Sequence, residues 1–205
     1  KINGSWLKEE QIKEVISNLK NINHSTLFEN NLASTQLLIE NTSVDINHEI
    51  GAKSPTVKYI DFDDVSKNHF LAVSQFMVDG AQTIIPDITL FVNGIPLIVI
   101  ECKAPDVTDP IHEGVNQLKR YMNTRGTQQS EGASKLFNTN AFVVVSCRTQ
   151  AKSGTISSNL EHYLSWKDPY PKNLEEFGKD EQDILVAGIL DKQNLLEIMR
   201  NFTIV

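Results

Sequence analysis

The stretch that decides the fold is Pro86-Asp87-Ile88-Thr89-Leu90-Phe91-Val92-Asn93-Gly94-Ile95-Pro96-Leu97-Ile98-Val99-Ile100-Glu101-Cys102-Lys103. It contains two apolar arms rich in Val, Ile, Leu and Phe, joined by Asn93-Gly94. Because Asn-Gly between two apolar runs is a strong signal for a tight turn, this stretch predicts an antiparallel β-hairpin.

Charged residues stand at the two open ends of this hairpin. Glu101 and Lys103 are two residues apart, so they project from one face of a strand, and Cys102 is expected to point to the other face, into the core. Asp87 and Glu101 would raise each other's pKa unless a cation separated them, and Mg²⁺ favours such oxygen ligands. With a lysine to orient water or to offset developing negative charge, this set suits metal-assisted phosphodiester hydrolysis.

The register of the hairpin decides whether the two carboxylates meet. A plain two-residue loop pairs Val92 with Ile95 and places Asp87 opposite Ile100, so that Asp87 faces away from Glu101. We therefore predict a three-residue or bulged turn, or an Asp87 lifted off the strand by Pro86. A regular two-residue hairpin would count against the site.

The pattern Pro86-Asp87 followed by Glu101-Cys102-Lys103 resembles the PD-(D/E)xK nuclease superfamily. The whole run from Pro86 to Pro105 resembles, more closely, the nuclease segment of the R (restriction) subunit of type I restriction-modification enzymes. Gln117-Leu-Lys-Arg-Tyr121 matches the Gln-x-x-x-Tyr motif that follows in that family. Further similarity covers most of the chain, except the first two dozen residues and residues 168–182.

This resemblance implies roles for individual residues. Asp87 and Glu101 would hold Mg²⁺, with the Cys102 carbonyl as a further ligand, and Lys103 would position or activate the attacking water. Gln117 and Tyr121, one helical turn apart, would contact DNA or orient the catalytic groups, the alternative being ordinary helix surface.

Glu29 has two open interpretations. Thr26-x-x-Glu29 is the pattern of a helix capping box, which alone explains the residue. Many nucleases of the superfamily also bring an acidic residue from an early helix to the metal, which makes Glu29 a candidate metal ligand.

The resemblance also implies partners. These are double-stranded DNA and the modification and specificity subunits of a restriction complex, with ATP used by motor domains of the complete subunit. Two alternatives stay open: a stand-alone repair or recombination nuclease, and a non-catalytic docking module of the motor complex.

The length, net charge and cysteine content of the chain indicate what kind of nuclease it could be. The chain has 205 residues, 40% of them hydrophobic, and a net charge of −7. A free-standing DNA-binding protein usually carries a basic face, so the acidic balance favours a nuclease that other domains deliver to DNA. The sequence shows no membrane span or signal peptide, and its two cysteines, Cys102 and Cys147, are expected to be reduced core residues of a cytoplasmic protein.

The coarse pattern is that of an α/β fold, a mixed central β-sheet flanked by helices. The resemblance implies that this fold is restriction-endonuclease-like. The pattern predicts helices over residues 6–19, from Thr26, over 111–123 and 160–166, and over 182–200 with a break near 190–192. It predicts strands over 57–62, 70–78 and 141–147 besides the hairpin. We expect an N-terminal helical segment at 1–25, the nuclease core at 26–167, and a helical segment at 168–205 leading toward a motor domain. The absent initial Met and the apolar end suggest a fragment cut before that motor.

Overall fold

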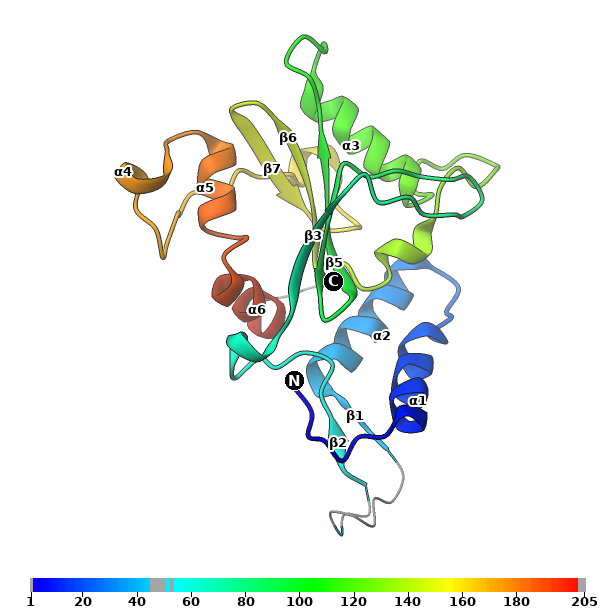
Figure 1. The fold of residues 1–205 in the computed structure, drawn as a ribbon. Coiled ribbons are helices and arrows are strands. Elements are labelled where there is room, and N and C mark those ends of the chain that lie inside the picture. The colour runs from blue at the N-terminus through cyan, green and yellow to red at the C-terminus, as the bar shows by residue number, and fades with distance from the viewer. Residues whose placement is uncertain (1, 45–50, 52–53, 203–205) are drawn as a thin grey trace.

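A five-stranded mixed sheet forms the centre of the molecule in the computed structural model, which describes residues 2–44, 51 and 54–202 (Figure 1). The strand order is β3-β4-β5-β6-β7, and only the β5–β6 pair is parallel. The strands are β3 (Phe70–Ser74), β4 (Ile88–Val92), β5 (Ile95–Cys102), β6 (Phe142–Cys147) and β7 (Gln150–Gly154). The predicted α/β class is confirmed.

Helices cover both faces of the sheet. Helix α3 (Pro110–Tyr121) connects the parallel strands β5 and β6, and it lies on one side of the sheet, while α5 (Glu181–Ala187) and α6 (Lys192–Asn201) lie on the other (Figure 1). Apolar side chains of the strands contribute to two hydrophobic cores, one on each face of the sheet, because successive side chains of a strand point to opposite faces. Val99 and Val143 pack in the core under α3, whereas Ile98 and Val144 pack in the core that α5 and α6 cover.

The N-terminal helices close the lower end of the sheet. Helix α1 (Glu9–Lys20) and α2 (Leu27–Glu40) precede a two-stranded ribbon of β1 (Thr42–Ser43) and β2 (Thr56–Val57). Buried Asn31 of α2 donates hydrogen bonds to the carbonyls of Phe137 and Asn140, just before β6. Shorter elements are the 3-10 helices η1 (Val65–Lys67), η2 (Ser134–Phe137) and η3 (Leu160–His162), and α4 (Leu174–Phe177).

The decisive hairpin has both a tight turn and a bulge. Val92 pairs with Ile95 across Asn93-Gly94, whose positive φ angles of 52° and 82° are those of a type I′ turn. Phe91 then pairs with Pro96 but Leu90 pairs with Ile98, so Leu97 is one extra residue on β5. Pro96 has no N–H to give to a ladder, which favours irregularity at this point. Of the predicted alternatives, the three-residue turn is wrong and a bulge is present, within β5 instead of in the turn. The bulge shifts the register at the open end of the hairpin by one residue.

Three predictions of secondary structure are wrong. Within the segment 57–62 only Val57 lies in a strand, and residues 160–166 contain one 3-10 turn instead of a helix. Strand β7 was not expected, because Gln-Ala-Lys-Ser-Gly lacks the β-branched and aromatic residues typical of strands. The division into segments 1–25, 26–167 and 168–205 stays a prediction, although Val15, Leu38 and Leu196 pack in one core.

Among the described residues, no helix combines the length and the apolar character needed to cross a membrane.

Candidate active site

The bulge brings Asp87 and Glu101 to the same face of the hairpin. Ile88 pairs with Ile100, so the register places Asp87, one residue before β4, opposite Glu101. Glu101 follows Val99 at the alternate position and therefore faces α3. The Asp87 carboxylate is fixed by two donors: Oδ2 accepts the N–H of Cys102 at 2.8 Å, and Oδ1 accepts the side-chain amide of Gln75 at 2.9 Å.

Glu101 and Lys103 form a buried ion pair. Nζ of Lys103 lies 2.9 Å from Oε1 of Glu101, and the two side chains are only 15% and 3% exposed. The other carboxylate oxygen, Oε2, is buried and has no hydrogen-bond partner within the described part of the chain. A buried carboxylate oxygen without a partner is costly, so one is unusual in a native protein.

Burial dominates the electrostatics of Glu101. Loss of solvent raises the pKa of Glu101 to about 7, the hydrogen bond from Lys103 opposes this rise, and the negative charge of Asp87 adds to it. A single lysine thus leaves the two carboxylates incompletely neutralised. A second cation near Oε2 would remove the conflict.

Gln117 and Tyr121 extend the site along α3. Oε1 of Gln117 accepts a hydrogen bond from Nζ of Lys103, and Nε2 of Gln117 donates to the Tyr121 hydroxyl at 2.6 Å. Tyr121 is 2% exposed, and its hydroxyl donates in turn to the carbonyl of Ile85 at 3.4 Å. The spacing of four residues puts both side chains on one face of the helix. They form a chain of contacts that fixes the direction of the Lys103 ammonium group.

Helix α3 can lie this close to the sheet because residue 114 is glycine. A Cβ atom built on Gly114 would lie 2.3 Å from Cγ1 of Val145 on β6. The lack of a side chain at this position therefore sets the distance between the helix that carries Gln117 and the sheet that carries Lys103.

The donor set fits a hard divalent cation. Mg²⁺ is commonly bound by one or two carboxylates and keeps several waters. Asp87 and Glu101 supply such carboxylates, and the Oε2 atom of Glu101 is a buried acceptor without a hydrogen-bond partner among the described residues. Within the described residues, no group of three or more His, Cys, Asp and Glu side chains is arranged to hold a metal ion, so further ligands would have to be backbone carbonyls or water.

The structure does not bring Glu29 to this group. Its Oε2 atom accepts from the backbone N–H and the hydroxyl of Thr26, both at 3.0 Å, and Thr26 in turn caps the Glu29 N–H. This is the complete capping box at the start of α2. The carboxylate is thereby occupied at an exposed helix end.

One expectation about the cysteines is corrected. Cys147 is buried as expected, but Cys102 is exposed. Cys102 is the last residue of β5, beyond the part of that face that the core covers, while its backbone N–H holds Asp87.

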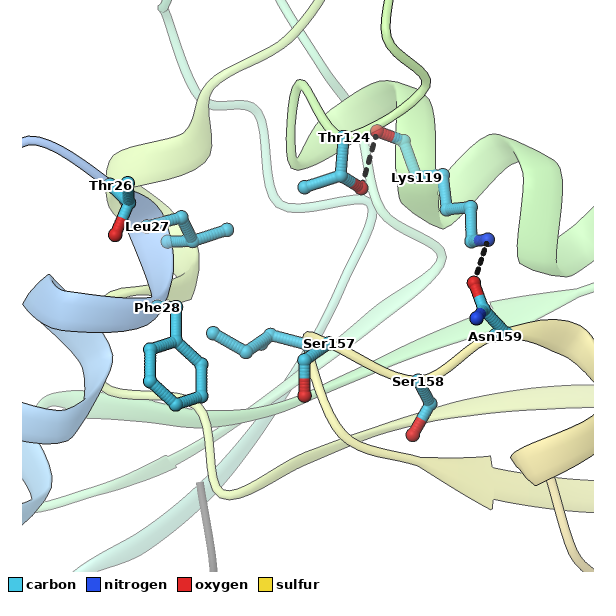
Figure 2. A pocket seen from close by; sticks show the side chains of 9 residues that line it. Thr26, Leu27, Phe28, Lys119, Thr124, Ser157, Ser158 and Asn159 are labelled. Carbon is cyan, nitrogen blue, oxygen red and sulfur yellow. Dashed lines mark hydrogen bonds between the residues drawn. The ribbon is translucent and has the colours of Figure 1, made fainter.

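A separate cavity of about 260 Å³ lies between the start of α2, α3 and the segment after β7. Figure 2 shows Lys119 of α3 bonded to Asn159 along one side of this space, with Phe28 on the opposite side and Ser157 and Ser158 below. Lys119 and Gln117 are two positions apart and so leave α3 in different directions. No residue of the carboxylate–lysine site lines this cavity.

The contact between Gln75 and Asp87 could not be predicted from the sequence. Gln75 lies just after β3, and only the pairing of β3 with β4 brings it to Asp87. No spacing or motif in the sequence predicts that contact.

Comparison with known proteins identifies the family of the chain. A family model described as the type I restriction enzyme R protein N terminus matches residues 1–162. The HindI endonuclease subunit of Haemophilus influenzae, a type I restriction enzyme, is 28% identical over 202 residues, which cover 97% of this chain and 18% of the relative.

Two Methanocaldococcus jannaschii proteins, provisionally named endonuclease subunits of the type I restriction enzymes MjaIXP and MjaVIIP, also match. The first is 25% identical over 219 residues and covers 97% of this chain and 20% of its own length. The second is 42% identical over 152 residues and covers 71% of this chain and 13% of its own length. The chain thus spans a fifth or less of the length of these relatives.

Proposed function

This chain belongs to the family of type I restriction enzyme R protein N termini, and on that premise we propose that it carries the DNA-cleaving site of such an enzyme. The substrate would be the phosphodiester backbone of double-stranded DNA, and the cofactor Mg²⁺. The observation that carries the proposal is the buried, unpartnered Oε2 atom of Glu101, on the same face as Asp87 and next to the Lys103 ammonium group.

The residues divide the work of hydrolysis. Asp87 and Glu101 would hold Mg²⁺, with the Cys102 carbonyl as a further ligand. When bound, the ion would supply Lewis-acid stabilisation of charge that develops on a phosphate oxygen. Lys103 would orient the attacking water and offset negative charge in the transition state.

Gln117 and Tyr121 would act through Lys103. A lysine side chain has four rotatable bonds, so its ammonium group needs partners to stay in one place. The acceptor Oε1 of Gln117 provides one, and the Tyr121 hydroxyl fixes the orientation of that amide. We infer that this chain of contacts keeps Lys103 aimed at the place where water attacks.

The setting would be a larger assembly. We infer that adjoining domains of the complete R subunit use ATP to translocate DNA, and that modification and specificity subunits supply sequence recognition. The net charge of −7 supports this dependence, because little in the charge balance would attract DNA to this chain alone.

Plasmid cleavage by the assembled restriction complex tests the proposal. Lys103→Ala in the R subunit is expected to abolish double-strand cleavage while ATP hydrolysis continues. Lys135→Ala is the matched control, because it removes the same charge from an exposed lysine. Unchanged cleavage by Lys103→Ala would show that the active site lies elsewhere, and strong cleavage by this chain alone would favour a stand-alone nuclease.

A further inference from the structure

Gln75 makes two contacts with Asp87. Its backbone N–H donates to the Asp87 carbonyl at 2.9 Å, which extends the β3–β4 pairing by one residue. Its side-chain amide, Nε2, donates to Oδ1 of the Asp87 carboxylate, also at 2.9 Å. The residue that follows β3 thus fixes both the main chain and the side chain of Asp87.

The backbone of Gln75 has an unfavourable conformation. Its φ angle is +54°, in the left-handed region, where glycine, asparagine and aspartate are the residues that fit well. Asparagine or glycine would relieve the strain at this position, but neither has a side chain as long as that of glutamine. An unfavourable backbone angle that persists beside an active site is often maintained for function.

The surroundings of Gln75 maintain this conformation. The next residue, Phe76, packs edge-to-face against Phe91 of β4, with ring centroids 5.1 Å apart. Two residues further on, Val78 forms an isolated bridge with Ile84. These contacts hold the chain after Gln75, and the β3–β4 pairing holds the chain before it, so the direction of the Gln75 side chain does not depend on its own hydrogen bond alone.

The contact with Gln75 completes a clamp on the carboxylate. Oδ1 of Asp87 receives the amide of Gln75 from the β3 side, and Oδ2 receives the N–H of Cys102 from the β5 side. One donor on each oxygen fixes the plane of the carboxylate. Each oxygen keeps a further lone pair, so a cation can still bind.

We propose that Gln75 is a positioning residue of the active site: its amide holds the Asp87 carboxylate in the orientation that binds the divalent cation. This inference rests on the proposed function, because it assigns Gln75 a part in the same metal site. It adds the residue after β3 to a site whose other members lie just before β4, at the end of β5 and on α3.

Calorimetric titration of this chain with Mn²⁺ and with Mg²⁺ tests the inference. Gln75→Gly and Gln75→Asn both suit a positive φ angle, so neither should lower the urea midpoint of unfolding. Both should bind the cation about tenfold more weakly, as expected for the loss of one hydrogen bond to a charged group. Gln128→Gly, the same change at an exposed loop position, is the control and should bind normally.

The readouts separate this inference from the proposed function. If the wild type binds the cation, Asp87→Asn abolishes binding, and both Gln75 variants bind as the wild type does, the inference is overturned and the metal site stands. If the wild type binds no cation at all, the proposed function fails and the inference fails with it. A metal-free test is also available, because the side-chain amide signal of Gln75 in ¹⁵N NMR spectra should shift in Asp87→Ala; an unshifted signal would also overturn the inference.

Discussion

Replacing Glu101 with glutamine should make the metal-free protein more stable at alkaline pH. Glu101 is buried, and its folded-state pKa of about 7 lies above the ordinary value of 4.5. For an acid whose pKa is raised by folding, the stabilising protonated form is fully present below pH 4.5. That contribution is lost as the pH rises from 4.5 through 7.

The size of the effect follows from the difference between the two pKa values. At about 1.36 kcal/mol per pKa unit, burial of the charged carboxylate lowers the free energy of unfolding by about 3 kcal/mol above pH 8. Glu101→Gln avoids this penalty, because glutamine is neutral and nearly the same shape. The variant should therefore match the wild type near pH 4.5 and exceed its stability by about 3 kcal/mol above pH 8.

Urea denaturation with EDTA, at intervals from pH 4.5 to pH 9, measures this difference. Glu29→Gln is the matched control: it makes the same chemical change at an exposed carboxylate, and glutamine can also complete a capping box. Its effect should be small at every pH. A constant difference between Glu101→Gln and the wild type across the whole range would refute the reasoning, since it would show that no buried charge forms.

Mg²⁺ should cancel most of the difference in stability between the two proteins. A ligand that binds only the folded state stabilises it by about 2.7 kcal/mol at a concentration one hundred times its dissociation constant. The wild type should gain this stabilisation and Glu101→Gln should not, because the variant lacks one carboxylate ligand. The same pair of proteins thus tests the electrostatic argument without metal and the proposed metal site with it.

Two further predictions concern the scaffold. Burial opposes ionisation of Asp61, but hydrogen bonds from the backbone N–H groups of Asp64 and Asp63 and the charge of Lys58 outweigh this effect. Together they hold the pKa of Asp61 below its ordinary value of 3.8. Asp61→Asn should therefore lower the free energy of unfolding by about 1–3 kcal/mol at pH 7. This loss should shrink as the pH falls below 3.8, and urea titrations at pH 7 and pH 3 would contradict it if they gave equal losses. Gly114→Ala should lower the free energy of unfolding by about 1–3 kcal/mol, because the added methyl group forces α3 away from Val145. It should also slow plasmid cleavage by the restriction complex, because Gln117 is displaced with the helix. An unfolding temperature equal to that of the wild type would contradict this prediction.

The central hairpin could be predicted because its pattern is local. Asn93-Gly94 and the apolar arms fix the strands. The requirement that Asp87 meet Glu101 predicted an irregularity in or near the turn, and the structure has one of the alternatives, a bulge, at Leu97. Strand β7 could not be predicted, because its pairing with β6 depends on tertiary context and its own residues have little tendency to form strands.

In the candidate site, too, features encoded locally in the sequence could be predicted, and contacts that depend on tertiary structure could not. Residues 87, 101 and 103 could be named from their spacing on the hairpin, and the spacing of 117 and 121 placed them on one helix face. The contact of Lys103 with Gln117 depends on how closely α3 approaches the sheet, which the sequence shows only as an unremarked glycine at 114. Gln75 was missed because its contact with Asp87 depends on strand register and on an unusual backbone angle.

The negative charge of the proposed site explains why it would depend on a cation and on the rest of the assembly. Without a cation, two carboxylates face one lysine, and that lysine is already bonded to Glu101 and Gln117. Such a site repels a phosphodiester, and the net charge of −7 adds to the repulsion at longer range. On the proposed function, Mg²⁺ has to bind before the scissile phosphate can approach, and other parts of the enzyme have to hold the DNA in place. A nuclease site built in this way would be inactive on passing DNA and would cut only where its partners deliver the substrate.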